Sequence, residues 1–404
     1  MSLARFAASD RAEVRCGNAL AGVLERTADG CVFLYDGGYL AGSGPAVATT
    51  LPKRREPFLT RGASLPPFFA NLLPEGVRME ALLRGVKSAK DDLLSALVVV
   101  GGDTVGDIAV VRPGEAVREE APVVDLDALG SVSFADLFEG SLRYGPAGHY
   151  ERSAMPGVQP KLSARHLTMR LRSRRREAHI LKLSSTDYPR IVENERFFMN
   201  AAKRARILAA TCSVVTDRSG ATALLVRRFD RVPAPDGVRK IHQEDACQLL
   251  NRFPGDKYAV SLHDVAEALS NVCDAPLLAV AELMRLYAFS YVIGNGDLHG
   301  KNVSVHAPEG ALRMTPAYDL VSTFPYRDRR MALKLDGRDA KLGRRAFADF
   351  GARFALRAPV VAAILDEVCD AAGSVVPELD TIGFDAKTTR ALAREIEARR
   401  AGLR

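Results

Sequence analysis

The chain has 404 residues, of which 47% are hydrophobic and 26% are charged, and its formal net charge is +7. This length exceeds what one compact core usually supports, so we expect two or three domains or lobes. The mild positive charge permits an anionic ligand or a nucleic acid but requires neither. No hydrophobic run reaches the length of a membrane span, the longest candidate being residues 93–100, and the N-terminus lacks the hydrophobic segment of a signal peptide.

The six cysteines are spread along the chain, and no two of them form a Cys-x-x-Cys pair. This pattern is typical of reduced thiols and argues against both a disulfide framework and a zinc site. We therefore expect a cytoplasmic protein without a membrane partner.

The first part of the chain predicts a small mixed unit. Residues 15–40 alternate hydrophobic and polar positions between glycine turns, which is typical of two or three strands. Residues 68–103 predict helices that close on a strand. Residues 111–135 are rich in Pro, Glu, Asp and Val without a strong period, and we interpret them as a connector. The sequence thus predicts an N-terminal subdomain over 1–112, followed by a connector over 113–145.

A glycine turn around Gly157 precedes a predicted hairpin. Its strands are expected at residues 167–171 and 179–183, and Lys182 lies among hydrophobic neighbours in the second. Glycine would let backbone N–H groups approach phosphate oxygens, and the lysine would supply a point charge. An ordinary hairpin with a solvated lysine is the alternative, because charged strand residues usually face water.

The next segment predicts a helix, for which Asp187 is the expected cap. Ile191, Glu195 and Phe198 fall on one helical stripe. A buried carboxylate needs a partner, and Lys182 on the preceding strand is the natural one. A lysine–glutamate pair of this kind holds nucleotide phosphates in kinases. The alternative is a glutamate that turns to solvent at the boundary of the stripe.

The segment 276–293 is hydrophobic on nearly all sides, so it predicts a buried helix that Gly294 ends. A hairpin is expected next, with strands near 302–306 and 311–315, Asn302 opposite about residue 315, and Asp319 brought back beside Asn302. Amide and carboxylate oxygens are hard ligands suited to Mg²⁺ and its phosphates.

Asp297 precedes Asn302 by five residues, which is the Asp-x-x-x-x-Asn spacing of the protein-kinase catalytic loop. It would orient an attacking hydroxyl or accept its proton. Lys301 would steady the transferred phosphoryl group, and His299 would shape the loop by hydrogen bonding. The ordered series of glycine loop, strand lysine, helix glutamate, catalytic loop and second aspartate predicts a phosphoryl-transfer site.

Six short blocks also resemble, in order, those of the HipA-like serine/threonine kinases, the toxin halves of bacterial toxin–antitoxin pairs. They are PGVQPKL (156–162), HILK (179–182), NERFFM (194–199), RRFDR (227–231), NGDLHGKN (295–302) and PAYDLVST (316–323). Two further blocks, FFANLLPEG (68–76) and VGGDTVGDIAV (100–110), resemble the N-terminal subdomain of that family. The resemblance covers about residues 10–390, and the block at 295–302 is the most specific.

The resemblance implies an α+β, bilobal protein-kinase-like fold with an additional N-terminal α/β subdomain and a mostly helical C-terminal lobe. The small lobe would span 146–232 and the helical lobe 233–404.

The resemblance also implies the site residues. Lys182, with Glu195, would bind the phosphates of ATP, and Asp297, with Lys301, would be catalytic. Asn302 and Asp319 would ligate Mg²⁺. The remaining implied ATP-binding positions are Gly157, Val158, Gln159, Lys161, Arg227, Phe229 and His299, with the backbone near Phe229 as the adenine hinge.

Members of the family use ATP to phosphorylate a protein serine or threonine, in studied cases on an aminoacyl-tRNA synthetase, which stops translation. A small DNA-binding, HipB-like antitoxin usually binds them, so their contact with DNA is indirect. Two positions depart from the family pattern: Arg227 replaces a frequent hinge glutamate, and Ala154 replaces the serine expected to be autophosphorylated. Ser153 is the nearest substitute for that serine. Two other functions stay open, a kinase of small molecules and a catalytically silent module that binds an antitoxin on DNA.

Overall fold

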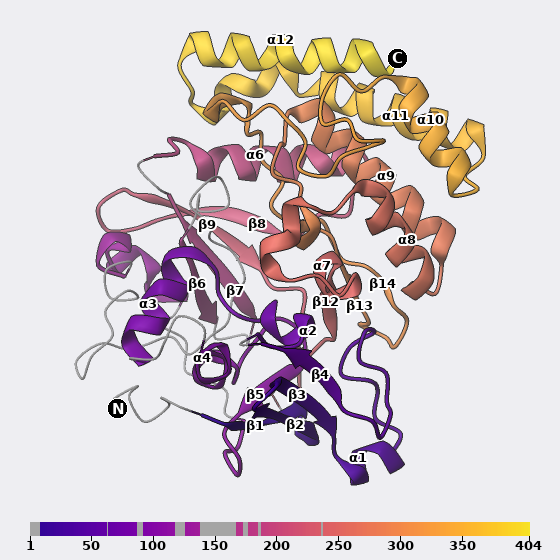
Figure 1. Ribbon diagram of the computed structural model, residues 1–404. Helices are drawn as coiled ribbons and strands as arrows, with labels where there is room; N and C mark the ends of the chain where they lie inside the picture. Colours follow the sequence, from indigo (N-terminus) through magenta and orange to yellow (C-terminus); the bar gives the residue numbers. More distant parts are fainter. Residues whose placement is uncertain are drawn as a thin grey trace. The chain divides into compact units, whose positions relative to one another are not determined.

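The computed structural model describes residues 9–62, 64–86, 92–117, 126–137, 167–172, 177–184, 187–235 and 237–404. The chain divides into two compact units, and Figure 1 labels their helices and strands. Unit 1 comprises Met1–His179, Thr216–Ala221 and Asp230–Pro254, and unit 2 comprises Ile180–Val215, Thr222–Phe229 and Gly255–Arg404.

Unit 1 contains a five-stranded antiparallel sheet with the order β4-β3-β2-β1-β5. Its strands are β1 (Arg11–Cys16), β2 (Ala19–Thr27), β3 (Gly30–Tyr35), β4 (Phe58–Arg61) and β5 (Ile108–Val111). The tight turn between β1 and β2 places Gly17 at a φ of 57°, a conformation that glycine adopts without steric cost. The strands predicted between residues 15 and 40 are present.

Helices supply much of the core of unit 1. They are α1 (Gly37–Ala41), α2 (Pro67–Ala70), α3 (Gly76–Val86) and α4 (Leu93–Val100). Phe68 and Phe69 of α2 join Phe33 of the sheet and Leu97 of α4 in one hydrophobic cluster. The predicted strand at the end of 68–103 is wrong, because α4 continues to Val100 and β5 begins only at Ile108. A short, wholly buried hydrophobic run cannot be assigned to helix or strand by periodicity.

The remaining elements of unit 1 are short. They are η2 (Leu126–Ser131), β6 (Leu167–Arg172), the hairpin β10 (Arg231–Ala234) and β11 (Gly237–Lys240), β12 (Gln243–Asp245) and α7 (Ala246–Leu249). Asp245 and Gln248 form a capping box that begins α7.

Unit 2 contains three neighbouring strands in the order β7 (Ala178–Leu183), β9 (Thr222–Arg227) and β8 (Cys212–Thr216). Helix α6 (Ile191–Arg204) packs against β9 and buries the predicted stripe, including Glu195. The helix begins one residue after Arg190, which occupies the N-cap position with a φ of 61°. The expectation that Asp187 caps this helix is therefore wrong.

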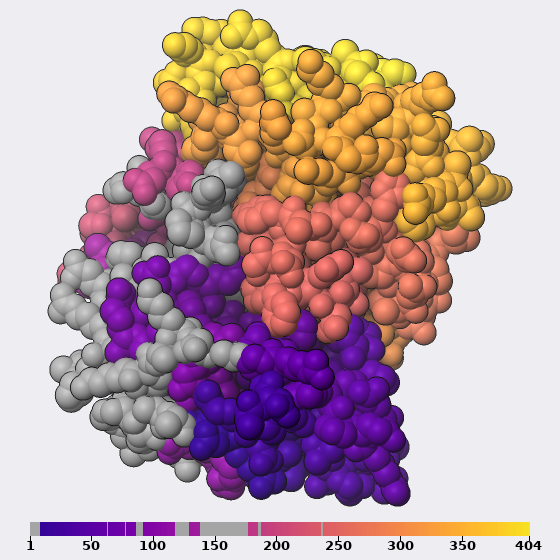
Figure 2. Space-filling view, in the orientation of Figure 1, coloured from indigo at the N-terminus to yellow at the C-terminus, as the bar shows by residue number. Residues whose placement is uncertain are grey.

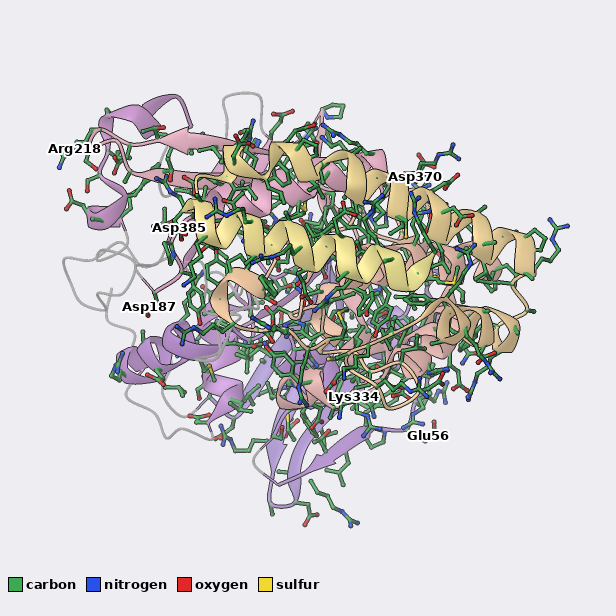
Figure 3. The ribbon with its side chains drawn as sticks, turned by 90° about the horizontal axis from the view of Figure 1, so that it is seen from above. Glu56, Asp187, Arg218, Lys334, Asp370 and Asp385 are labelled. Carbon is green, nitrogen blue, oxygen red and sulfur yellow. The ribbon has the colours of Figure 1, made fainter. Side chains whose placement is uncertain are left out.

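The rest of unit 2 is mostly helical. Its elements are η4 (Pro254–Tyr258), α8 (Leu262–Val272), α9 (Pro276–Ile293), η5 (Gly300–Asn302), β13 (Ser304–His306), β14 (Arg313–Met314), η6 (Phe324–Tyr326), α10 (Arg344–Arg353), α11 (Ala358–Ser374), η7 (Val376–Ile382) and α12 (Ala386–Leu403). The carboxylate of Asp385, labelled in Figure 3, caps α12 by accepting from the N–H groups of Lys387 and Thr388. The side chains of α10 to α12 form a closely packed surface in the orange and yellow part of Figure 2.

Helix α9 is the central helix of unit 2, packed against α8, α10, α11 and α12. Glu282 and Arg285 interrupt its hydrophobic run. Within the described ranges it is nevertheless the one helix that length and composition alone would allow to cross a membrane, and 67% of it is buried inside the protein. A core helix of this kind passes the same test of length and composition. Gly294 ends the helix in the left-handed conformation with a φ of 73°, as its sequence position predicted.

Candidate active site

Lys182 lies at the centre of a cluster of charged side chains in unit 2. Its Nζ donates a hydrogen bond of 2.7 Å to Glu195 Oε1 and a second bond to Asp319 Oδ1. The side chains of Lys182 and Glu195 are 11% and 2% exposed, whereas that of Asp319 is 41% exposed. The buried glutamate of α6 thus meets the partner that the sequence predicted for it.

Asn302 lies beside Asp319, with its Nδ2 donating to Asp319 Oδ2 at 3.1 Å. The hairpin of β13 and β14 brings the chain back to this point, and the N–H of Thr315 donates to the carbonyl of Ser304 at 2.9 Å. The predicted register is therefore wrong by two residues, since residue 315 lies opposite Ser304 and not Asn302. Asn302 belongs to the 3₁₀ turn η5 and not to the strand. The expected meeting of Asn302 with Asp319 nevertheless occurs.

Tyr318 fixes the backbone next to Asp319, a role that the sequence did not indicate. Its hydroxyl bonds to the carbonyl of Lys301 at 2.8 Å and to Ser304 Oγ at 2.6 Å. Asp319 itself has a φ of 56°, in the left-handed region that non-glycine residues seldom adopt. The tyrosine therefore ties the segment that contains the strained aspartate to Lys301 and Ser304.

Asn194 ties helix α6 to the segment that follows Asp319. Its Nδ2 donates to the carbonyl of Ser322 at 2.9 Å, and its Oδ1 accepts the N–H of Ser322 at 3.1 Å. Asn194 is fully buried and precedes Glu195 in the helix. Two adjacent side chains of α6 thus contact the site, since Glu195 bonds to Lys182 and Asn194 bonds to the segment after Asp319. No local sequence pattern indicates this role of Asn194, because its partner is the backbone of Ser322, far along the chain.

The loop after α9 is held by its neighbours on both sides. The N–H of Gly296 donates to Thr323 Oγ1 at 2.9 Å, and its carbonyl accepts the N–H of Ala332 at 3.0 Å. A Cβ atom at position 296 would lie 2.5 Å from the carbonyl oxygen of Arg330, so glycine is required for this close approach.

Asp297 is half-buried and is linked to the cluster through Asn295. The Oδ1 of Asn295 accepts the N–H of Asp297 at 3.1 Å, and its Nδ2 lies 3.5 Å from the carbonyl oxygen of Asp319. The carboxylate of Asp297 accepts a hydrogen bond of 3.0 Å from the hydroxyl of Tyr258. The backbone and the side chain of Asp297 are therefore held by different partners.

His299 and Lys301 are buried in the same loop. The N–H of His299 donates to Asn302 Oδ1 at 3.2 Å, and the N–H of Asn302 donates back to the carbonyl of His299 at 2.9 Å. These two bonds close the turn. The backbone of His299 thus helps to close the turn, and the predicted role of its side chain stays a prediction.

The expected hinge follows β9. The N–H of Arg227 donates to the carbonyl of Thr211 at 2.9 Å. The ring of Phe229 lies 6.0 Å from that of Tyr318 and 5.9 Å from that of His306, measured between centroids. The predicted positions Gly157, Val158, Gln159, Lys161 and Ser153 lie outside the described residues.

The donor atoms at Asn302 and Asp319 suit a hard divalent cation. An amide oxygen has two lone pairs, so Asn302 Oδ1 retains one after accepting the His299 N–H. Within the described part of the chain, no group of three or more His, Cys, Asp and Glu side chains is placed to hold a metal. A Mg²⁺ ion here would therefore take most of its ligands from phosphate and water, as is usual for this ion.

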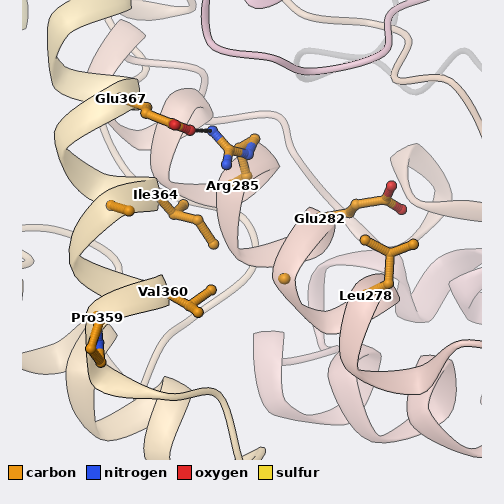
Figure 4. Close-up of a pocket in the computed structure, with 9 residues that line it drawn as sticks. Leu278, Glu282, Arg285, Pro359, Val360, Ile364 and Glu367 are labelled. Atoms are coloured by element: carbon orange, nitrogen blue, oxygen red, sulfur yellow. Dashed lines mark hydrogen bonds and ion pairs between the residues drawn. The ribbon is translucent and has the colours of Figure 1, made fainter.

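A small hollow of about 360 Å³ lies elsewhere in unit 2, between α9 and α11 (Figure 4). Leu278, Val360 and Ile364 line it, and an ion pair of 2.6 Å joins Arg285 Nη1 to Glu367 Oε2 at its edge. It contains none of the predicted site residues.

Comparisons with known proteins identify the family and the fold. The HipA-like C-terminal domain matches residues 153–376, and the HipA N-terminal domain matches residues 12–111. A Sinorhizobium fredii protein named as a kinase, Y4mE, is 35% identical over 312 residues, which cover 72% of each chain. The serine/threonine-protein kinase toxin HipA of Shewanella oneidensis is 27% identical over 292 residues, which cover 67% of this chain and 66% of the toxin.

A solved structure of HipA from Shewanella oneidensis, in complex with HipB and operator DNA, shares the fold with a TM-score of 0.78 over 97% of each chain, at 22% identity. The fold class is therefore an α+β, protein-kinase-like one with a HipA-type N-terminal domain, as predicted. The chain belongs to the HipA family, whose C-terminal domain model alone covers more than half of it.

Proposed function

We propose that this protein is an ATP- and Mg²⁺-dependent serine/threonine protein kinase that acts as a HipA-like toxin. The observation that carries the proposal is the meeting of Lys182 with Glu195 and Asp319, beside Asn302. A buried lysine shared between two carboxylates, one of them exposed next to an amide, is an arrangement suited to phosphate and metal ligands.

In this proposal each side chain has one task. Lys182 contacts the phosphates of ATP, and Glu195 holds the lysine in place. Asn302 and Asp319 would hold Mg²⁺, which would neutralise charge on the phosphates when bound. Lys301 steadies the transferred phosphoryl group.

Asp297 orients the hydroxyl of a substrate serine or threonine toward the γ-phosphorus. A bond forms between that oxygen and phosphorus while the bond to the leaving ADP oxygen breaks, and the hydroxyl proton passes to the Asp297 carboxylate.

The family implies the target and the partner. An aminoacyl-tRNA synthetase is the candidate protein substrate, and its phosphorylation would stop translation and growth in the cytoplasm. The Shewanella relative was solved with HipB and operator DNA, which supports a small HipB-like antitoxin as the partner of this chain. DNA would then be contacted through the antitoxin. Ser153 is the proposed site of autophosphorylation.

The proposal is tested by incubating the protein with Mg²⁺, γ-labelled ATP and a cell lysate. We expect the parent to label one dominant protein band, and Asp297→Asn to label it about a hundredfold more slowly or less. Asp349→Asn is the matched control, because this exposed α10 residue undergoes the same change away from the loop. Equal labelling by the parent and Asp297→Asn would contradict the assigned role.

Two other outcomes would favour the alternatives. Label that appears only in small molecules would indicate a small-molecule kinase. No label with any variant, together with binding of an antitoxin, would indicate a catalytically silent module.

A further inference from the structure

Tyr258 contacts the proposed catalytic aspartate directly, although no local sequence pattern indicates this contact. It closes the short helix η4, and its hydroxyl donates to Asp297 Oδ1 at 3.0 Å. Its ring stands edge-on to the ring of His299, with centroids 5.1 Å apart and planes at 84°. Two residues of the catalytic loop therefore meet one tyrosine from another part of the chain.

The backbone around Tyr258 is held firmly. The N–H of Ala259 donates to the carbonyl of Asp256 at 2.8 Å, which closes the turn. Helix α8 begins at Leu262, after a capping box of Ser261 and Asp264. The N–H of Leu262 donates to the carbonyl of Lys334 at 3.0 Å. The position of the tyrosine is thus set on both sides by secondary structure.

The tyrosine is nevertheless accessible, being 38% exposed. At this exposure the hydroxyl of Tyr258 could form its hydrogen bonds with water, so burial does not force it to bond to a protein group. The hydrogen bond to Asp297 instead orders an exposed side chain on the carboxylate that would meet a substrate hydroxyl. A carboxylate accepts roughly four hydrogen bonds, so one from Tyr258 and one from a substrate are compatible.

We propose that Tyr258 is a positioning residue for phosphoryl transfer, which holds the carboxylate of Asp297 in the orientation that receives the acceptor hydroxyl. This inference rests on the proposed kinase function. The N–H of Asp297 is fixed by Asn295, so the backbone of the aspartate does not depend on the tyrosine. Removal of the hydroxyl alone should therefore loosen the carboxylate and leave the loop in place.

The test is Tyr258→Phe, which keeps the ring against His299 and removes only the hydroxyl. Initial rates of label transfer to the lysate band are measured over a range of ATP concentrations. We expect the maximal rate to fall about tenfold, as for the loss of a hydrogen bond to a charged group, with the apparent KM for ATP changed less than twofold. The melting temperature should stay that of the parent, whereas a merely structural role would lower it. Tyr188→Phe is the matched control, because its ring packs on Tyr326 and it lies outside the loop.

A double-mutant cycle shows whether the tyrosine acts through the aspartate. Adding Tyr258→Phe to Asp297→Asn should lower the residual rate less than twofold, because the positioned group is already gone. An unchanged rate in Tyr258→Phe, a rate increase from unblocking the acceptor position, or a full tenfold loss on top of Asp297→Asn would each overturn the inference. If the parent itself transfers no label, the proposed function fails first. If the parent is active and Asp297→Asn is not, only the role of Tyr258 is in question.

Discussion

Two aspartates, one in each unit, show how the same side chain serves different ends. Asp217 of unit 1 accepts from the N–H groups of Ser219, Ala221 and Phe134 and from the Ser219 hydroxyl, at 2.7 to 2.9 Å. Three of these donors bond to Oδ1 and the N–H of Phe134 bonds to Oδ2, so the protein uses most of the acceptor capacity of this carboxylate. Among the described residues, Asp319 of unit 2 accepts from Lys182 and Asn302, and its side chain is 41% exposed.

The two carboxylates differ in how many of their acceptor sites the protein itself fills. Asp217 is completed by the protein itself, so its carboxylate stabilises a turn and has little capacity left for a ligand. Asp319 has one lysine and one amide beside it and is partly open to solvent, so a cation can bind the remaining lone pairs of its carboxylate. The same substitution, aspartate to asparagine, should therefore affect function at one position and stability at the other.

The largest expected effect is that of Asp319→Asn on phosphoryl transfer. The change removes a charged oxygen ligand, and the rate of label transfer should fall about a thousandfold, equivalent to about 4 kcal/mol. Stability should change by less than about 1 kcal/mol, because the carboxylate is partly solvated and asparagine has the same shape. Labelling rates and urea unfolding measure the two effects. A rate within tenfold of the parent would remove Asp319 from the site.

Asp217→Asn should give the opposite result. The asparagine cannot accept from all four donors, and buried N–H groups left without a partner should lower the free energy of unfolding by about 2 kcal/mol. Label transfer at a temperature where the variant is folded should match the parent within twofold. The midpoint of urea unfolding provides the measurement, and an unchanged midpoint would show that the four bonds contribute no net stability.

The smallest expected effect is the pH dependence of the stability difference between the parent and Asp217→Asn. Burial alone would raise the pKa of Asp217, but the hydrogen bonds from Phe134, Ser219 and Ala221 outweigh it and lower the pKa to about 2. A depressed pKa contributes stability that is present above the unfolded value of about 4 and is lost as the pH falls toward 2. The stability gap between the parent and Asp217→Asn should therefore narrow between pH 4 and pH 2. Thermal unfolding at each pH measures this stability difference. A difference that stays constant between pH 4 and pH 2 would contradict the lowered pKa of Asp217.

The contrast also explains how far the sequence could predict the site. Lys182, Glu195 and Asn302 could be found because each lies in a short window whose periodicity or spacing carries chemical meaning. The cost of a buried charge indicated Lys182 as a partner for Glu195 but left a solvated glutamate as the alternative, and the structure shows the pair. Asp319 could be predicted to lie beside Asn302 because a hairpin after Asn302 would bring the chain back to it.

The rest depended on contacts that no local pattern records. Tyr318 and Asn194 bond to backbone groups far along the chain, and Tyr258 reaches Asp297 across 39 residues. The hairpin register was missed because η5 takes Asn302 out of the strand. In the fold, α4 was missed in part because a fully buried run has no polar face to reveal its period.

We propose that Lys182, Asn302 and Asp319 form one site for nucleotide phosphates and Mg²⁺. Calorimetric titration of ATP into the parent and into Asp319→Asn, each with and without Mg²⁺, tests this proposal. We predict that Mg²⁺ tightens binding to the parent at least about tenfold, equivalent to about 1.4 kcal/mol, and leaves binding to the variant unchanged. ATP binding to the parent that is independent of Mg²⁺, or the same Mg²⁺ effect in both proteins, would contradict the account.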